Sequence, residues 1–125
     1  MGQQQLLLIV LGVIIVGIAV VVGINLFNAN AEESAIDTTV SEATNIAAMG
    51  LQFYKKPIAL GGGGNDFTGF EAIVPVTLTT TDYCTHVVGP GTTTDLPIAS
   101  SHTDYGFTVA VNVTNAGVYT TVVTR

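Results

Sequence analysis

The sequence predicts an α+β fold: a long N-terminal α-helix, apolar in its first half and amphipathic in its second, packed on a small C-terminal antiparallel β-sheet. From Leu6 to Ile24 no charged or strongly polar side chain occurs. Apolar residues then recur at steps of three and four as far as Tyr54, the period of an amphipathic helix. Beyond Phe70, short runs rich in Thr, Val and aromatic residues are bounded by Gly, Pro, Asn and Asp, which is typical of strands.

The segment from Leu6 to Ile24 is long enough to cross a membrane. At about 1.5 Å per residue it covers roughly the 30 Å of a bilayer's hydrocarbon core. In lipid it must be helical, because only a helix satisfies every backbone hydrogen bond of a lone segment. The first basic residue is Lys55, so the segment lacks the positively charged start of a cleaved secretory signal. We expect that a basic leader has already been removed and that Met1 is the mature N-terminus.

The amphipathic half is expected to continue the same helix through Tyr54. The helix should stop there because Pro57 disfavours helical angles in the residue before it, and Lys55 and Lys56 suit the negative end of the helix dipole. The apolar positions of this half are Ile36, Val40, Ala43, Ala47, Leu51 and Tyr54. The polar positions that fall largely elsewhere around the helix are Glu32, Glu33, Asp37, Ser41 and Glu42. A single helix from near Met1 to Tyr54 is about 80 Å long, which is far more than a small domain can cover. Something outside the chain must therefore bury its first half.

The remaining sequence predicts a connection followed by a sheet of about four strands. Gly61–Gly64 is expected to be a flexible connection, since a phosphate-binding loop would need a preceding strand and a following Lys-Ser or Lys-Thr helix. The candidate strands are Ala72–Thr80, Tyr83–Val88, Gly106–Thr114 and Gly117–Thr124. In the third, Phe107, Val109, Val111 and Val113 form one apolar face. Pro75 indicates an edge or a bulge, Gly89–Asp104 a long loop, and Asn115–Gly117 a hairpin turn.

These elements divide the chain into four segments. Residues 1–27 form the apolar transmembrane or core helix, and residues 28–56 its amphipathic continuation. Residues 57–70 form the Gly-rich connection, and residues 71–125 the β-sheet head domain.

Composition makes nucleic-acid binding improbable. The formal net charge is −6, and Lys55, Lys56 and Arg125 are the only basic side chains. Affinity for nucleic acid comes largely from Lys and Arg that neutralise phosphates, so this chain is expected to bind none.

No catalytic, cofactor or metal site is predicted. Cys84 is the single cysteine, so an intrachain disulfide is excluded, and a buried apolar role is preferred over a reactive or intermolecular thiol. Cys84 and His86 point to the same face of a strand, but two ligands do not make a zinc site. His102 is expected to be an ordinary histidine, and the aspartates lack the Asp-x-Asp spacing of calcium loops. We expect no enzyme activity.

The order of an apolar helix, an amphipathic continuation and a β domain resembles type IV pilins and their relatives. With Met1 as the first mature residue, Gln5-Leu6-Leu7 falls where bacterial pilins commonly carry Glu-Leu-Leu. The resemblance covers roughly residues 1–56 by pattern, and the rest of the chain by class only. It implies cleavage by a prepilin peptidase, methylation of the new N-terminus, and polymerisation by the pilus assembly machinery. The subunit would lie in the inner or cytoplasmic membrane before assembly and in an extracellular cell-surface filament afterwards.

The start of the chain departs from the family pattern. In the family a glutamate at the fifth mature position attracts the N-terminal amine of a neighbouring subunit, whereas here the matching residue is the uncharged Gln5. We expect Met1, Gln3, Gln4 and Gln5 to form the assembly contact, with the amides making a polar collar. The alternative is a plain interfacial flank of a membrane helix. Cleavage after Gly2 would instead make Gln3 the first residue, as in archaeal pilins.

The resemblance also assigns roles within the apolar helix. The residues expected in the filament core are Leu6, Leu7, Leu8, Ile9, Val10, Ile14, Ile15, Ile18 and Val21. The proline that often breaks this helix in bacterial pilins is missing, so we expect helix loosening between Gly17 and Gly23. The alternative is that these glycines allow close helix packing.

The resemblance therefore implies a major pilin, a structural subunit that forms a helical homopolymer without cofactors. One alternative is a single-pass membrane anchor whose β domain binds a partner; another is a minor pseudopilin of a secretion system.

Asn112-Val113-Thr114 fits the acceptor pattern for N-glycosylation, and Thr92–Thr94 could carry O-linked sugar.

Overall fold

A computed structural model describes residues 2–125, so the expectations for Met1 lie outside the described residues. The chain divides into two compact units, Met1–Ser34 and Ala35–Arg125. Helix α1 (Gly2–Lys55) supplies the whole described part of the first unit and the first element of the second. The remaining elements are η1 (Ile58–Leu60), α2 (Phe70–Ile73), α3 (Val76–Thr79), β1 (Cys84–Val88), β2 (Asp95–His102), β3 (Thr108–Thr114) and β4 (Tyr119–Thr124).

Helix α1 confirms the predicted continuous helix to within one residue of its expected end. It ends at Lys55. Pro57, two residues later, has extended angles, with φ −62° and ψ 148°, and is the N-cap of η1. The helix is unbroken through Gly17 and Gly23 in the single chain. Loosening at these glycines thus stays a prediction for an assembled form.

The glycine run does more than connect. The amide of Gly63 donates to the carbonyl of Phe53 at 2.8 Å, and the amide of Gly64 donates to that of Lys56 at 3.0 Å. These carbonyls belong to the end of α1 and its next residue, where a helix leaves acceptors without intrahelical partners. The run expected to be a flexible connection is therefore a hydrogen-bonded cap on the helix end.

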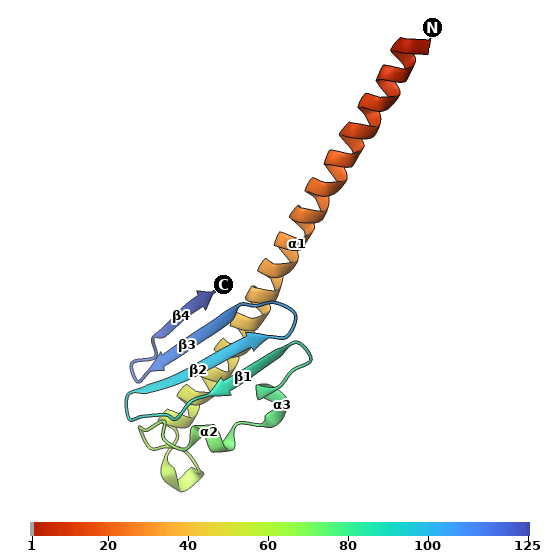
Figure 1. The fold of residues 1–125 in the computed structure, drawn as a ribbon. Coiled ribbons are helices and arrows are strands. Elements are labelled where there is room, and N and C mark those ends of the chain that lie inside the picture. Colours follow the sequence, from red (N-terminus) through yellow and green to blue (C-terminus); the bar gives the residue numbers. More distant parts are fainter. Residues whose placement is uncertain (1) are drawn as a thin grey trace. The chain divides into compact units, whose positions relative to one another are not determined.

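The four strands form an antiparallel sheet in the order β1-β2-β3-β4, each strand beside the next one along the chain (Figure 1). In this register His86 lies opposite Ser100, and Ser100 lies opposite Val109. The predicted strands at Tyr83–Val88, Gly106–Thr114 and Gly117–Thr124 are confirmed with trimmed ends. The predicted hairpin turn is confirmed as well, with Gly117 at φ 82°.

The predicted strand Ala72–Thr80 is wrong. This stretch holds the end of α2 and all of α3, and only Thr80 makes an isolated bridge, to Thr85. The β-branched composition suggested a strand, but Pro75 has no N–H to give to a ladder and its φ of −61° suits the residue before a helical turn. Its carbonyl accepts the amide of Leu78 at 3.0 Å, which closes that turn.

The predicted long loop Gly89–Asp104 is wrong too, because it contains β2. Leu96, Ile98 and Ser100 are buried and alternate with exposed neighbours, as in a strand with one covered face. Pro97 is tolerated because its carbonyl accepts the amide of Gly89 at 2.9 Å, just past the end of β1. Its nitrogen faces the same side, so the missing N–H removes no bond to β3.

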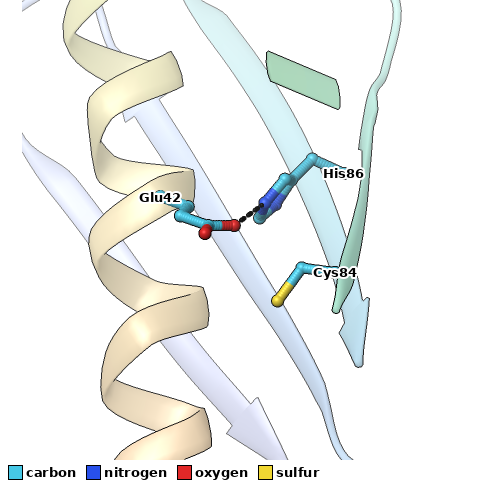
Figure 2. Close-up of side chains that lie close together, drawn as sticks. All are labelled: Glu42, Cys84 and His86. Carbon is cyan, nitrogen blue, oxygen red and sulfur yellow. Dashed lines mark hydrogen bonds and ion pairs between the residues drawn. The ribbon is translucent and has the colours of Figure 1, made fainter. Parts of the chain in front are cut away.

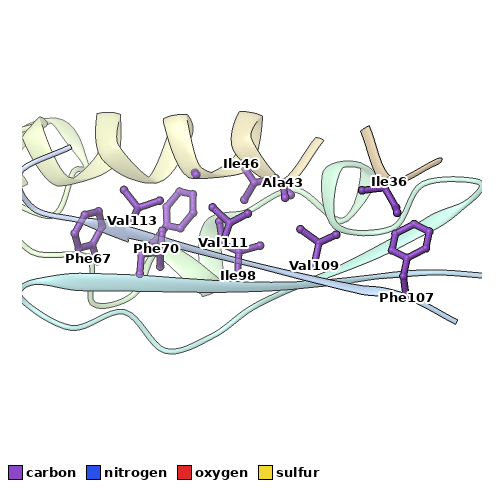
Figure 3. Packing of buried hydrophobic residues seen from close by; sticks show 12 residues of the cluster. Ile36, Ala43, Ile46, Phe67, Phe70, Ile98, Phe107, Val109, Val111 and Val113 are labelled. Carbon is purple, nitrogen blue, oxygen red and sulfur yellow. The ribbon is translucent and has the colours of Figure 1, made fainter. Parts of the chain in front are cut away.

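The core lies between the second half of α1 and one face of the sheet (Figure 3). Its buried apolar members are Ile36, Ala43, Ile46, Ala47, Phe67, Phe70, Leu96, Ile98, Phe107, Val109, Val111 and Val113. Figure 3 shows Ile46 and Ala43 on the helix above Val111 and Val109 of the sheet. Burying a side chain of this size contributes about 1.5–3 kcal/mol, so this contact explains why the amphipathic half is helical. The predicted α+β fold is confirmed.

Candidate functional site

The first candidate site is the apolar segment of α1, Leu6–Phe27. Every described side chain from residue 2 to residue 30 is exposed, and the large apolar side chains of the segment are between 48% (Val10) and 74% (Phe27) exposed. By length and composition the helix is able to cross a membrane. A segment of this kind could anchor the protein in a membrane.

The described residues that are expected to make assembly contacts directly precede this segment. Gln3, Gln4 and Gln5 occupy successive positions near the start of α1, so their side chains point in directions about 100° apart. All three are exposed. Their arrangement is compatible with a polar collar and equally with an interfacial flank, and the expected role stays a prediction.

Small residues interrupt the apolar surface on two sides of the helix. At about 100° per residue, Gly12, Ala19 and Gly23 fall within roughly 20° of one direction, while Gly17 lies about 140° away from Gly12. Nothing in the single chain comes within 4 Å of a methyl group placed at any of the three glycines. Each position therefore leaves room for another helix to approach closely.

The second candidate site is a polar cluster in the unit 35–125, between α1 and the face of the sheet that α1 covers. His86, on β1, is only 2% exposed, and both of its ring nitrogens have partners. Nε2 lies 2.8 Å from Oε2 of Glu42 on α1, and Nδ1 lies 2.6 Å from Oγ of Ser100 on β2 (Figure 2 shows the first contact). With an ionised carboxylate and a neutral ring, Nε2–H donates to Glu42 and Nδ1 accepts the Ser100 hydroxyl.

Cys84 lies beside this pair, two residues earlier on the same face of β1. Its side chain is fully buried, and Sγ is 3.2 Å from Oγ1 of Thr39. The Thr39 hydroxyl gives its single proton to the carbonyl of Ala35 at 2.8 Å, so the thiol is the donor in the contact with sulfur. The prediction that Cys84 is buried in a strand and shares a face with His86 is confirmed.

Glu42 forms the solvent side of the cluster. Its side chain is 33% exposed, whereas that of His86 is completely covered. The Thr81 hydroxyl lies 3.3 Å from Oε2 of Glu42 and also accepts the amide of Cys84 at 3.2 Å. The donor atoms of Glu42, Cys84 and His86 all lie within 4.8 Å of one another.

Sequence reasoning missed Glu42 and Ser100 as members of this cluster. Glu42 was assigned to the polar surface of α1, but it lies at the edge of the buried stripe, one residue before Ala43. Its partner His86 is 44 residues away along the chain. Ser100 stood in the segment expected to be a loop, so its place opposite His86 could not be inferred.

Other residues considered from the sequence lie elsewhere. His102 packs among the rings of Tyr83, Tyr105 and Phe107, and its Nδ1 accepts the amide of Asp104 at 3.1 Å. Asn112 is exposed on β3, on the sheet face opposite the buried valines. Glycosylation of Asn112 thus stays a prediction.

The polar cluster suits coordination better than nucleophilic catalysis. Ser100 and His86 are hydrogen-bonded, but Ser100 is 2% exposed on the covered face of β2, where a substrate has no access to its hydroxyl. No buried side-chain nitrogen or oxygen among the described residues lacks a hydrogen-bond partner.

In comparisons with protein-family models, with curated proteins and with solved structures, nothing matched this chain.

Proposed function

We propose that this chain is the structural subunit of a type IV pilus-like filament. The observation that carries the proposal is one unbroken helix with two different surfaces. Its first part exposes apolar side chains in every direction, and its second part is covered by the sheet along a narrow stripe. The first part would lie in the membrane before assembly and among the helices of other subunits afterwards.

The free energy of covering the apolar segment is large enough to drive such an assembly. About 20 apolar side chains at roughly 1.5 kcal/mol each amount to tens of kcal/mol per subunit relative to exposure in water, before entropy is subtracted. Lipid covers this surface as well as protein does, so assembly becomes favourable only as the subunit leaves the membrane. Identical subunits whose contacts do not close then grow as a helical fibre.

The small residues support packing on more than one side. A symmetric helix pair needs one close-packing face, whereas a subunit inside a fibre touches neighbours in several directions. The Gly12–Ala19–Gly23 face and the separate position of Gly17 supply two such directions.

The remaining expectations belong to the same proposal. The amides of Gln3, Gln4 and Gln5 would meet neighbouring chains near the fibre axis, where they contribute hydrogen bonds but no net charge. Processing by a prepilin peptidase, methylation, export by a pilus machinery and an extracellular location follow from the resemblance to pilins. The head domain would form the outer part of the fibre.

The test is to look for the fibre in cells that make the protein. Sheared surface material would be viewed by negative-stain microscopy and its components identified by peptide mass fingerprinting. We expect thin filaments in which this chain is the major protein. Finding the chain only in membranes, released by detergent as monomers, would overturn the proposal in favour of a membrane-anchored β domain. Filaments dominated by a different subunit would instead make it a minor pseudopilin.

A further inference from the structure

We propose that Glu42, Cys84 and His86 form a binding site for a zinc ion in the head domain. The three side chains come from two elements, α1 and β1, and converge on one point beneath the sheet (Figure 2). Two of the three residues are almost completely buried, and their donor atoms lie within 4.8 Å of each other and of the Glu42 carboxylate.

The donor set selects the metal. A thiolate sulfur, an imidazole nitrogen and a carboxylate oxygen are the three ligand types that Zn²⁺ takes in proteins. Ca²⁺ and Mg²⁺ prefer oxygen ligands alone, so neither suits a site with Cys84 and His86. Three protein ligands leave one of the four tetrahedral positions open, and Glu42 is exposed enough for water to fill it.

The distances require a small adjustment. With bonds to nitrogen and oxygen of about 2.0–2.2 Å, a tetrahedral ion holds these two ligand atoms roughly 3.4 Å apart. Nε2 of His86 and Oε2 of Glu42 are now 2.8 Å apart in a direct hydrogen bond. The Glu42 carboxylate must therefore move by about half an ångström, which its position at the rim of the cluster allows. The Cys84 sulfur lies within 4.8 Å of the other two ligand atoms and must come to roughly 3.6 Å from each of them.

The surrounding residues provide the hydrogen bonds that a metal site needs. A histidine bound through Nε2 usually donates its other N–H to an oxygen, and Oγ of Ser100 lies 2.6 Å from Nδ1 of His86. The Thr81 hydroxyl can hold the Glu42 carboxylate in place, since it lies 3.3 Å from Oε2. These contacts orient His86 and Glu42 before an ion arrives, and the 3.2 Å contact with Oγ1 of Thr39 orients the Cys84 sulfur.

Zinc binding would release one proton and move another. The thiol of Cys84 must lose its proton, which is released to solvent. The neutral ring of His86 keeps one proton but carries it on Nδ1 instead of Nε2, so the Ser100 hydroxyl changes from donor to acceptor. Zn²⁺ thus takes the place, between Nε2 of His86 and Oε2 of Glu42, of the proton that joins these atoms in the metal-free protein. The ion would tie α1 to β1 and stabilise the folded head domain, because the unfolded chain lacks the site.

The experiment uses the full chain in detergent micelles, freed of metal with a chelator and titrated with Zn²⁺ or Co²⁺. We expect one ion per chain, a rise in the melting temperature of the head domain, and a sulfur-to-cobalt charge-transfer absorption with Co²⁺. Glu42→Gln should lower the affinity at least tenfold while keeping an acceptor for His86. Cys84→Ser should abolish the sulfur-to-cobalt absorption.

Matched controls separate the site from adventitious binding. Glu71→Gln removes an exposed carboxylate from α2, and His102→Gln removes the other histidine; neither should change the stoichiometry or affinity. Glu42→Gln changes a side chain that is 33% exposed and should fold even if Cys84→Ser does not, which hydrogen exchange of β2 and β3 would verify. If the wild-type chain binds no ion, or Glu42→Gln binds as tightly as the wild type, the three residues form only a hydrogen-bonded cluster. Neither result depends on filament formation.

Discussion

Gly63 occupies a position that no other residue type fits. A methyl group on its Cα would overlap the carbonyl oxygen of Asp66, and that oxygen is part of the backbone and has no rotamer to escape to. The amide of Gly63 also donates to the carbonyl of Phe53 at 2.8 Å. The end of α1 is therefore capped by a turn that requires glycine.

Replacing this glycine should weaken the head domain. We expect Gly63→Ala to destabilise it by about 2 kcal/mol, because the backbone must shift and the cap on Phe53 is strained. Hydrogen exchange of the β2 and β3 amides would measure the change in micelles. Gly106→Ala is the matched control, since nothing lies within 4 Å of the added methyl group there. Equal stability of the two variants would contradict this account of the glycine run.

Asp66 and Thr68 form a second local contact that can be tested by titration. The Thr68 hydroxyl, at 2.6 Å, and next the Thr68 amide, at 2.8 Å, donate to Oδ1 of Asp66, and together they lower the pKa of this carboxyl below its ordinary value of 3.8. A lowered pKa in the folded state stabilises the fold at pH values above the ordinary pKa. This contribution is lost as the pH falls through the folded-state pKa.

Thr68→Ala should therefore raise the pKa of Asp66 toward its ordinary value. The rise should be incomplete, because the amide of residue 68 still donates to the carboxylate. Thr68→Ser keeps the hydroxyl and should leave the pKa low. A carboxyl titration followed by NMR would show both effects. A pKa that is the same in the Ala and Ser variants would mean that the hydroxyl bond does not form in solution.

At the scale of elements, the strongest periodic patterns were readable from sequence. Helix α1 follows from the apolar and amphipathic patterns that no proline interrupts before Pro57. β3 follows from the alternate residues Val109, Val111 and Val113, with Phe107 just before the strand. β2 was hidden because its buried face carries Ser100 beside Leu96 and Ile98, and its exposed face carries a proline, a composition usual in loops. Helix α3 was hidden because four-residue helices have no periodicity to detect.

The polar cluster shows where such reasoning stops. Alternation on β1 correctly put Cys84 and His86 on one face. Whether Glu42 or another residue of α1 would face them depends on how the helix lies along the sheet, which no local pattern determines. The sequence separation of 44 residues between Glu42 and His86 leaves this to the packing of the core.

The contact between helix and sheet should depend on Ile46. This side chain is 1% exposed and lies on the helix face above the sheet (Figure 3). We expect Ile46→Ala to destabilise the head domain by about 2–5 kcal/mol through lost burial and the cavity left behind. Ile58→Ala deletes the same atoms from a side chain that is 74% exposed, and it should cost under about 0.5 kcal/mol. If both variants lose the same protection from hydrogen exchange, α1 is not packed on the sheet in solution.

On the scale of the whole molecule, the chain joins two units with different solvent requirements. The unit 35–125 has a buried core and can face water, whereas the segment Leu6–Phe27 exposes apolar side chains all around. A membrane and a fibre of identical subunits both cover such a segment. They differ in shape selectivity, because lipid chains adapt to any side chain and a packed protein interior does not.

That difference allows one substitution to separate the filament from the simple anchor. Gly17→Leu keeps the segment apolar, so insertion in the membrane should be unchanged or slightly better. In a fibre the added side chain would keep a neighbouring helix at a distance, and an overpacking cost of about 1–3 kcal/mol lowers the assembly equilibrium by about 5- to 150-fold. Val16→Leu adds a single methylene next to it and should assemble almost normally. The measurement is the ratio of sheared filament to membrane-bound subunit. A ratio that Gly17→Leu leaves unchanged would show that no close helix neighbour lies at this position, and would favour the anchored monomer.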